Sequence, residues 1–396
     1  MNFSLLNFFI YVSLLFISAD RISINLPIGN VRIVQFFLII AFIILFSKIN
    51  IKIEKENAFI FLILVFYFFI NIIFSYNKLR TISYLIWIIY NYIFIFLLFS
   101  NYIYNFKFEN FEKRFLLIYR IISYYVFIQF FFGLLGISDP FFGTNFTFGV
   151  PRPYIWMYEP SYLATYLTPY FIYSNYNFLI NKDMDYSKDS KISTFALIFT
   201  TSTSGYLLML LFALFIFSYY LINLKIKKVF KILSYLVIIL LFVIVLSLIF
   251  VPELFNYFFL RLFKLGIRAS APERVSKWFE TLRVIKDNFL IGVGAGAYGT
   301  YVSNNIKDVA SNITLEIMAE LGFYGFFIIS ILLIQIFKPL FFSIQIRKEK
   351  KLMALFWSII FLIIILQSNQ NYLRLYLWAQ ISYFYGYILM LKEKYQ

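Results

Sequence analysis

The run Ala58-Phe-Ile-Phe-Leu-Ile-Leu-Val-Phe-Tyr-Phe-Phe-Ile-Asn-Ile-Ile-Phe-Ser75 decides the fold, because it contains no charged residue. About 20 apolar residues in a helix cross the roughly 30 Å hydrocarbon core of a bilayer. Similar runs recur along the whole chain of 396 residues, which is 62% hydrophobic and 14% charged. Soluble domains are only about 45–50% apolar. The sequence therefore predicts an all-α polytopic integral membrane protein that forms a single membrane domain over 1–396.

Eleven runs are long enough to span: 3–19, 32–47, 58–75, 82–100, 115–137, 160–180, 204–223, 232–251, 309–337, 352–368 and 371–390. A shorter run, 192–202, ends in the hydroxyl-rich stretch 200–205 and indicates a broken helix, which needs burial in protein or a cavity to line. Counting it gives about 12 transmembrane helices. If 192–223 were one helix, giving eleven spans, the Lys-rich loops on either side of it would face opposite compartments.

The distribution of cations predicts which side of the membrane each loop faces. Twenty of the 35 Lys and Arg residues lie in six segments: 48–57, 101–114, 181–191, 224–231, 338–351 and 391–396. The short loops between these segments carry few cations. Because cytoplasmic loops collect Lys and Arg, we expect both termini in the cytoplasm and the segments 138–159 and 252–308 outside. Arg120, inside an expected span, is interpreted as structural.

The long outer loop 252–308 carries eight cations against five acids, within a chain of net charge +16. Apolar residues at three- and four-residue steps predict a surface helix over 273–286, opened by Pro272. Those residues are Val275, Trp278, Phe279, Leu282 and Ile285. An interfacial helix on the lipid headgroups explains this pattern. A compatible interpretation is that Arg268 and Arg274 form a fork for a pyrophosphate, since guanidinium groups bind phosphate oxygens bidentately.

Carboxylates at the membrane boundary are the other candidates for chemistry. Glu159 precedes Pro160, which resembles the first residue of a helix, so Glu159 is either a helix cap or a base that also orients Arg152. Glu316 and Glu320 lie four apart on one helix face inside a span, after Asn312. Buried carboxylates in a membrane are expensive and suggest function. They could serve a proton or cation pathway, or pair with the outer-loop arginines. Weaker candidates stand at the start of the last span: Asn371 and Arg374.

Composition and one rejected motif narrow the function further. The chain has no cysteine and no histidine, which excludes disulfides, thiolate metal sites and imidazole catalysis. No basic stretch is long enough to track a nucleic-acid backbone. The glycines of 292–299 match a dinucleotide-binding pattern formally, but no βαβ unit surrounds them. They are better explained by a tight turn or by a close approach of the backbone to a ligand.

Several motifs in a fixed order resemble one family. Arg152 and Glu159 fit an Arg-x6-Glu-Pro-Ser block, which is followed by the Thr/Ser-rich break and by the Arg-bearing surface helix. A Gly-x-Gly turn and then Ser-Asn-x3-Glu-x3-Glu-Leu-Gly-x2-Gly complete the series. From about 140 to 336 the chain is similar to the O-antigen polymerase and O-antigen ligase superfamily of bacterial surface-polysaccharide enzymes.

The resemblance implies a metal-independent glycosyltransferase without a cofactor, in a fold related to membrane glycosyltransferases of the GT-C type. It implies the bacterial cytoplasmic (inner) membrane, an undecaprenyl-pyrophosphate-linked glycan as donor and as acceptor, and contacts with membrane lipids. It also suggests a flippase and a chain-length regulator as partners. By resemblance, Arg152, Arg268 and Arg274 contact the pyrophosphate and Glu159 occupies the acidic position. We expect Glu159 and Arg274 to be catalytic. The remaining substrate-binding candidates are Trp278, Asn312, Glu316 and Glu320.

Two departures from the family pattern bear on the reaction. Ser204 stands where many members have Arg, and Ser311 stands where ligases present a His. The second departure favours a polymerase of O-antigen, capsular or exopolysaccharide repeat units. The alternatives are a ligase that transfers polymer to lipid A-core and, from another class, a flippase or transporter of lipid-linked oligosaccharide. The long outer loop and the lack of an evident internal repeat speak against a transporter.

Overall fold

The computed structural model describes residues 3–26, 29–147, 150–222, 270–305, 308–369 and 371–395. The chain divides into two compact units. The first unit combines Met1–Tyr119 with Arg274–Gln396, and the second is Arg120–Glu273. Each unit is described by itself.

The described residues in the first half of the first unit form α-helices, one π-helix and a hairpin. The helices are α1 (Phe3–Phe16), α2 (Ile33–Phe46), α3 (Lys55–Phe74), α4 (Lys78–Asn91), π-helix η1 (Tyr92–Leu97), α5 (Leu98–Phe106) and the start of α6 (Phe108–Leu134). Strands β1 (Ser23–Leu26) and β2 (Gly29–Arg32) pair antiparallel, with Ser23 opposite Arg32. Helix α4 begins at a cap, because the Asn77 side chain accepts a hydrogen bond from the Arg80 amide at 3.1 Å.

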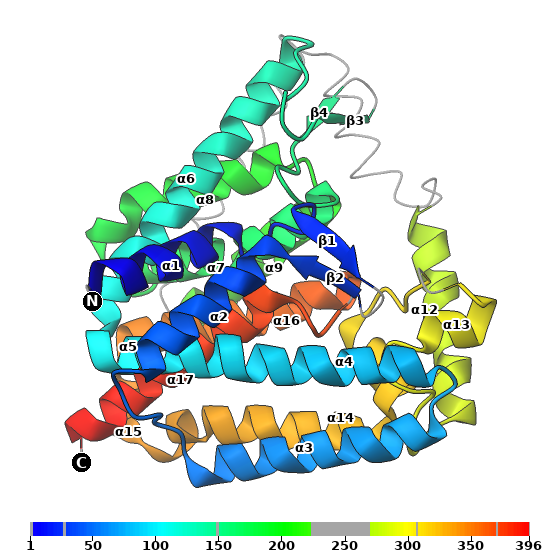
Figure 1. Ribbon diagram of the computed structural model, residues 1–396. Coiled ribbons are helices and arrows are strands. Elements are labelled where there is room, and N and C mark those ends of the chain that lie inside the picture. Colours follow the sequence, from blue (N-terminus) through cyan, green and yellow to red (C-terminus); the bar gives the residue numbers. More distant parts are fainter. Residues whose placement is uncertain are drawn as a thin grey trace. The chain divides into compact units, whose positions relative to one another are not determined.

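The secondary-structure elements described in the second half of the first unit are all helices, joined by turns and loops. Its elements are α12 (Ser270–Asp287), α13 (Tyr298–Ser303), α14 (Ile313–Phe342), α15 (Ile344–Arg347), α16 (Lys350–Ile365), 3-10 helix η4 (Leu366–Ser368) and α17 (Leu375–Tyr395). Helix α14 runs beside α3, and α17 packs on α5 and α16 (Figure 1). The core between these helices is aromatic: Phe96, Phe99, Phe384 and Tyr385 are fully buried.

Helix α14 is broken at Gly322, whose φ of 63° and ψ of −171° are not helical. A side chain there would strike the backbone, because a Cβ on Gly322 would stand 2.4 Å from the Leu290 carbonyl oxygen and 2.6 Å from the Gly292 nitrogen. The break therefore separates a short first segment, which carries Glu316 and Glu320, from the long apolar remainder of the helix.

The second unit contains the rest of α6 with strands β3 (Asn145–Thr147) and β4 (Val150–Arg152), then α7 (Pro160–Leu179), 3-10 helix η2 (Met184–Tyr186), α8 (Ser187–Phe199) and α9 (Thr203–Ile222). Helices α8 and α9 both pack on α7. Arg120 pairs with the fully buried Asp189 through two hydrogen bonds of 2.6 Å, and Tyr170 donates to the same carboxylate at 2.7 Å. This closed network agrees with a structural role for Arg120.

The all-α membrane character is confirmed. Six helices among the described residues are long and apolar enough to cross a membrane, whereas α1 and α2 are apolar but shorter. The expected interruption is present, because α8 ends at Phe199 and α9 starts at Thr203, with Thr201 at a φ of 47° between them. The expected span 232–251 lies outside the described residues. The count of twelve spans, the sidedness and the relation to GT-C enzymes stay predictions.

Candidate functional site

The residues predicted to form the site fall in both units. Arg152 and Glu159 belong to the second unit, and Arg268 lies outside the described residues. The first unit holds the other five: Arg274, Trp278, Asn312, Glu316 and Glu320. Two groups of residues are therefore described in turn.

The carboxylates of α14 are deeply buried at the start of that helix. Asn312 is the N-cap and its side chain accepts a hydrogen bond from the Leu315 amide at 3.0 Å. Glu316 and Glu320 follow on one face and are each 3% exposed. A buried carboxylate needs hydrogen-bond donors or a cation to be stable. Both of these carboxylates have donors from one short segment of the chain.

That segment is the turn before α17. The Asn371 amide, held at a φ of 89°, donates to Glu316 at 2.6 Å, and the Tyr372 hydroxyl donates to Glu320 at 3.0 Å. Asn is one of the few residues that tolerate such a positive φ. The two carboxylates thereby fasten the turn at 371–372 to the first segment of α14.

Two arginines complete a group that we call the carboxylate cluster: Glu316, Glu320, Tyr84, Tyr372, Arg80 and Arg374. Arg374 lies within electrostatic range of Glu316, and Arg80 lies within electrostatic range of Glu320. The Arg80 guanidinium also stands 5.2 Å from the ring centre of Tyr84, a cation–π distance. Each acid of α14 thus has a cation near it. These cations are not the outer-loop arginines considered from the sequence.

Arg374 also leads to a second buried acid. Its guanidinium binds Asp20 at 2.8 Å, and Arg32 binds the other oxygen of the same carboxylate at 2.7 Å. Asp20 is 4% exposed and lies just before β1, while Arg32 ends β2. The hairpin near the N-terminus is therefore tied to the start of α17 by a shared carboxylate.

The glycine-rich turn approaches protein, not an open site. Gly292, Gly294 and Gly296 all have positive φ. A Cβ on Gly294 would stand 2.0 Å from the Ser75 hydroxyl oxygen, and one on Gly296 would stand 2.3 Å from a ring carbon of Tyr84. The expected tight turn is present, whereas the close approach is to protein and not to a ligand: the neighbours belong to α4, α14 and the end of α3. The turn holds the carboxylate cluster in place, since the Gly294 amide donates to the Glu320 carbonyl at 3.0 Å.

Helix α12 divides its apolar residues between two sides. Val284 and Ile285 are buried in a cluster with Tyr298, whereas Val275, Phe279 and Leu282 are exposed. The helix expected over 273–286 is present as α12, and Ile285, at one edge of its expected apolar stripe, packs against protein while Val275, Phe279 and Leu282 stay exposed. Figure 1 shows α12 beside α13.

Arg274 and Trp278 stand one turn apart on α12, and both are half-buried. The Trp278 indole nitrogen is buried without a hydrogen-bond partner among the described residues, although indole N–H groups can only donate. One turn further along, the Thr281 hydroxyl lies 2.9 Å from that of Tyr298, whose pKa is raised by burial. Along this stripe of α12, Arg274 is a half-buried cation, Trp278 is an unsatisfied donor, and Thr281 packs against Tyr298.

In the second unit, Glu159 occupies the N-cap position of α7 and Pro160 follows as the first helical residue. Its carboxylate makes no capping hydrogen bond and instead accepts one from the Ser161 hydroxyl. The position expected from the sequence is therefore confirmed, while the capping function of the side chain is not observed. Glu159 as a whole is half-buried.

The loop that carries Arg152 and Glu159 is held by a polar network. Gln129 on α6 accepts hydrogen bonds from the Tyr154 and Ile155 amides at 3.0 Å each and donates to Asp139 at 3.0 Å. The Thr201 hydroxyl donates to the Pro151 carbonyl at 3.3 Å. The hydroxyl-rich break after α8 therefore packs against the strand that ends at Arg152. The structure brings together two motifs that are about 50 residues apart in the sequence.

Sequence reasoning missed several members of the carboxylate cluster. Arg80 lies in a short loop between apolar runs, and nothing in the sequence distinguishes Tyr84 and Tyr372 among 33 tyrosines; the same holds for Asp20 and Arg32, which lie next to the cluster. Their position in the sequence could identify the charged ones. A charged residue directly at the end of an apolar run needs a partner when the ends of two spanning helices pack together. Asn371 and Arg374 are candidates from their place at the start of the last span: Asn371 donates to Glu316, and Arg374 belongs to the cluster.

Comparison with known proteins gives one finding. Residues 191–330 match the family model described as O-antigen ligase. This segment is similar to the O-antigen polymerase and ligase superfamily. It extends from α8 to the middle of α14 and so includes the hydroxyl-rich break, α12, the glycine-rich turn and both carboxylates of α14. No curated protein and no solved structure matches the chain. The superfamily supports O-antigen polymerase or ligase activity, a glycosyltransferase-like reaction in polysaccharide biosynthesis.

Proposed function

We propose that this protein polymerises undecaprenyl-pyrophosphate-linked oligosaccharide repeat units into O-antigen, capsular or exopolysaccharide at the outer face of the bacterial inner membrane. The observation that carries the proposal is the O-antigen ligase match over residues 191–330, which contain the Arg-bearing helix α12. The half-buried stripe of Arg274 and Trp278 supports it, because a cation beside an unsatisfied donor suits an anionic, oxygen-rich ligand.

In the proposed reaction, a hydroxyl of the acceptor sugar attacks the anomeric carbon of the donor glycan. The bond between that carbon and the pyrophosphate oxygen breaks, and the lipid pyrophosphate leaves with the bonding electrons. Arg274, together with Arg152 and Arg268, stabilises the charge that develops on the leaving group, an electrostatic role for which no metal is needed. Glu159 accepts the proton of the attacking hydroxyl.

The two sets of carboxylates suit different tasks. Glu159 is half-buried and its side chain accepts a hydrogen bond from a neighbour in sequence, so an incoming hydroxyl can reach it. Glu316 and Glu320 are 3% exposed and accept hydrogen bonds from the turn at 371–372. We infer that they position this end of the first unit, next to the substrate, and do not take part in proton transfer.

A polymerase is preferred to a ligase because of Ser311. This residue, at a φ of 57° directly before the N-cap Asn312, stands where the resemblance places a ligase histidine. A serine hydroxyl does not titrate near neutral pH, so it cannot replace an imidazole as base. The acceptor is then a second lipid-linked glycan and not lipid A-core.

Deleting the gene and isolating the lipid-linked glycans tests the proposal. Loss of a polymerase leaves single repeat units on the carrier at the outer face. Loss of a ligase leaves full-length polymer on its carrier, and loss of a flippase leaves single units inside the cell. Either of the last two results would overturn the proposed reaction.

Site residues are tested in the deletion strain by complementation with variants. Arg274→Ala should abolish the long-chain polysaccharide ladder at an unchanged protein level, whereas Arg283→Ala should restore it. Arg283 is a matched control because it is an exposed arginine of the same helix α12. A normal ladder with Arg274→Ala would remove this residue from the site.

A further inference from the structure

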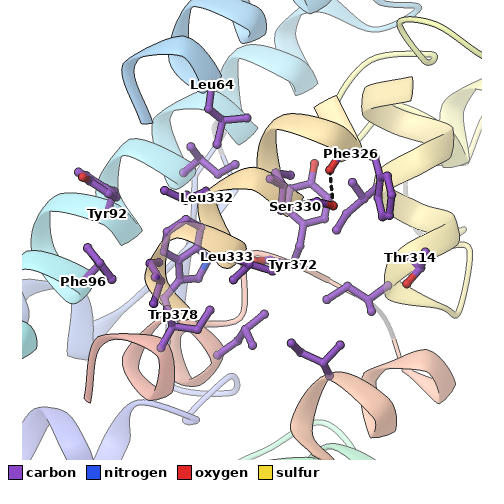
Figure 2. Close-up of a pocket in the computed structure, with 18 residues that line it drawn as sticks. Leu64, Tyr92, Phe96, Thr314, Phe326, Ser330, Leu332, Leu333, Tyr372 and Trp378 are labelled. Carbon is purple, nitrogen blue, oxygen red and sulfur yellow. Dashed lines mark hydrogen bonds between the residues drawn. The ribbon is translucent and has the colours of Figure 1, made fainter. Parts of the chain in front are cut away.

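An apolar cavity of about 170 Å³ lies inside the first unit. Its wall includes Leu64 of α3, Ile317, Ile329 and Leu333 of α14, Ile363 of α16 and Trp378 of α17. Figure 2 shows these helices around the cavity, with Leu64, Leu333 and Trp378 among its labelled side chains. The cavity extends on both sides of the break at Gly322, since Ile317 precedes the break and Ile329 follows it.

Three polar side chains of the wall, those of Ser330, Trp378 and Tyr372, are bonded to the protein itself, whereas the buried Tyr92 hydroxyl has no hydrogen-bond partner among the described residues. The Ser330 hydroxyl donates to the Phe326 carbonyl at 2.8 Å, a bond drawn in Figure 2. The Trp378 indole donates to the Tyr372 carbonyl at 2.9 Å, and the Tyr372 hydroxyl donates to Glu320. Because the three bonded groups are satisfied and most of the other lining residues are Ile, Leu or Phe, the wall presents mainly hydrocarbon to whatever occupies the cavity. A buried water needs two to four polar partners, so one unsatisfied hydroxyl in a mainly apolar wall does not suffice to hold it.

The position of the cavity determines what can enter it. Helices α3, α14 and α16 are candidate membrane spans, so the medium around this part of the unit is lipid hydrocarbon. Ile329, Leu333, Ile363 and Trp378 are only half-buried, and the wall therefore reaches the surface of the unit. A dry cavity of about 150 Å³ is known to bind benzene, so the present one has room for a fragment of about six carbons.

The backbone beside this cavity departs from regular α-helical geometry in two places. The π-helix η1 replaces one stretch of α-helix where the chain passes the cavity, and its Tyr92 and Phe96 belong to the wall. Short π-helical segments occur frequently at functional sites, because they displace side chains that a regular helix would place elsewhere. The cavity therefore coincides with two departures from helical geometry, at η1 and at Gly322.

We propose that this cavity binds the end of a hydrocarbon chain of a membrane lipid. The chain is either the prenyl chain of a lipid carrier, a source that rests on the proposed function, or the acyl chain of a phospholipid, which does not. In both cases the bound segment lies directly beside the helix segment of Glu316 and Glu320. An occupied cavity supports the carboxylate cluster from the membrane side, because Tyr372 belongs to both.

Fluorescence of Trp378 tests the proposal without any measurement of activity. The full chain is prepared with Trp378 as its single tryptophan, the other four being replaced by Phe: Trp87, Trp156, Trp278 and Trp357. It is placed in vesicles of phosphatidylglycerol with brominated acyl chains, which quench nearby indoles. Two variants fill the cavity, Ile329→Phe and Leu333→Phe. The matched control is Ile334→Phe on the same helix, because Ile334 is 64% exposed and outside the wall.

We expect strong quenching of Trp378 that falls to about half in either cavity-filling variant and is unchanged in the control. Adding an unbrominated long-chain prenyl phosphate then separates the sources: relief of quenching identifies a prenyl chain, and persistent quenching identifies an acyl chain. Quenching that is equal in wild type and in both folded filling variants would overturn the proposal. If occupancy is observed while lipid-linked glycans in the deletion strain contradict a polymerase, only the proposed function fails.

Discussion

The carboxylate cluster of the first unit and the Glu159 loop of the second unit use the same chemical group in opposite ways. Glu320 is 3% exposed and accepts a hydrogen bond from Tyr372, some 52 residues away in the sequence. Glu159 is half-buried and accepts one from Ser161, two residues away. A carboxylate with distant protein partners holds structure together, whereas one with a local partner at the surface can still exchange protons with a substrate. Substitutions in the carboxylate cluster should therefore change mainly stability, and substitution of Glu159 should change mainly activity.

The largest effect is expected for Gly322→Ala, because its Cβ would meet backbone atoms of Leu290 and Gly292 at 2.4 to 2.6 Å. We expect a loss of about 4 kcal/mol or more in the free energy of unfolding, seen as loss of monodisperse protein after detergent extraction. Gly136→Ala is the control, since Gly136 also has a positive φ, 74°, but nothing lies within 4 Å of its Cβ. That variant should cost only about 1–2 kcal/mol. Equal yields of the two variants would contradict the packing of the glycine-rich turn.

Asp20→Ala should come next, because it leaves the buried Arg374 and its neighbour Arg32 without their shared carboxylate. Removing one partner of a buried ion pair typically costs about 3–5 kcal/mol, and the 19% exposure of the Arg32 side chain places this case near the lower end. The thermal midpoint of the purified protein measures the effect. A variant in which Asp20 and Arg374 are replaced by Asn and Met should recover part of the loss, and no recovery would argue against the pairing.

Glu320→Ala should lower the free energy of unfolding by about 1–3 kcal/mol, because it leaves the buried hydroxyl of Tyr372 without an acceptor. Tyr372→Phe removes the donor as well as the need for an acceptor. The double variant Glu320→Ala with Tyr372→Phe should therefore be more stable than Glu320→Ala alone. Thermal midpoints of the three variants form the test, and strict additivity would show that the two side chains do not interact.

The smallest change in stability is expected for Glu159→Gln, within about 0.5 kcal/mol, because the amide oxygen can still accept the hydrogen bond from Ser161. Polymer formation in complemented cells should nevertheless be lost, since an amide cannot accept a proton at neutral pH. Glu159→Asp should retain part of the activity. A full-length ladder from Glu159→Gln at a normal protein level would exclude Glu159 as the base and leave the carboxylate cluster as the place to search.

Several features of this protein were predictable from the sequence because they depend on local patterns. Uncharged runs such as 58–75 predict spanning helices wherever they fold, since the bilayer leaves a backbone no other way to satisfy its polar groups. Pro160 marked the start of α7, and the stretch 200–205 marked the break between α8 and α9. The motif order predicted the superfamily that the match over residues 191–330 confirms.

Only the tertiary structure decided which side chains meet. Asp20, Arg32 and Arg374 are joined through a carboxylate although up to 354 residues separate them, and no period or propensity encodes such a pairing. The sequence of the 292–299 turn is compatible with a ligand beside its glycines, but in the structure the adjacent space is occupied by α3, α4 and α14. The physical reason is that helix formation depends on neighbours along the chain, whereas desolvated charges, close glycine contacts and cavities depend on how distant helices pack.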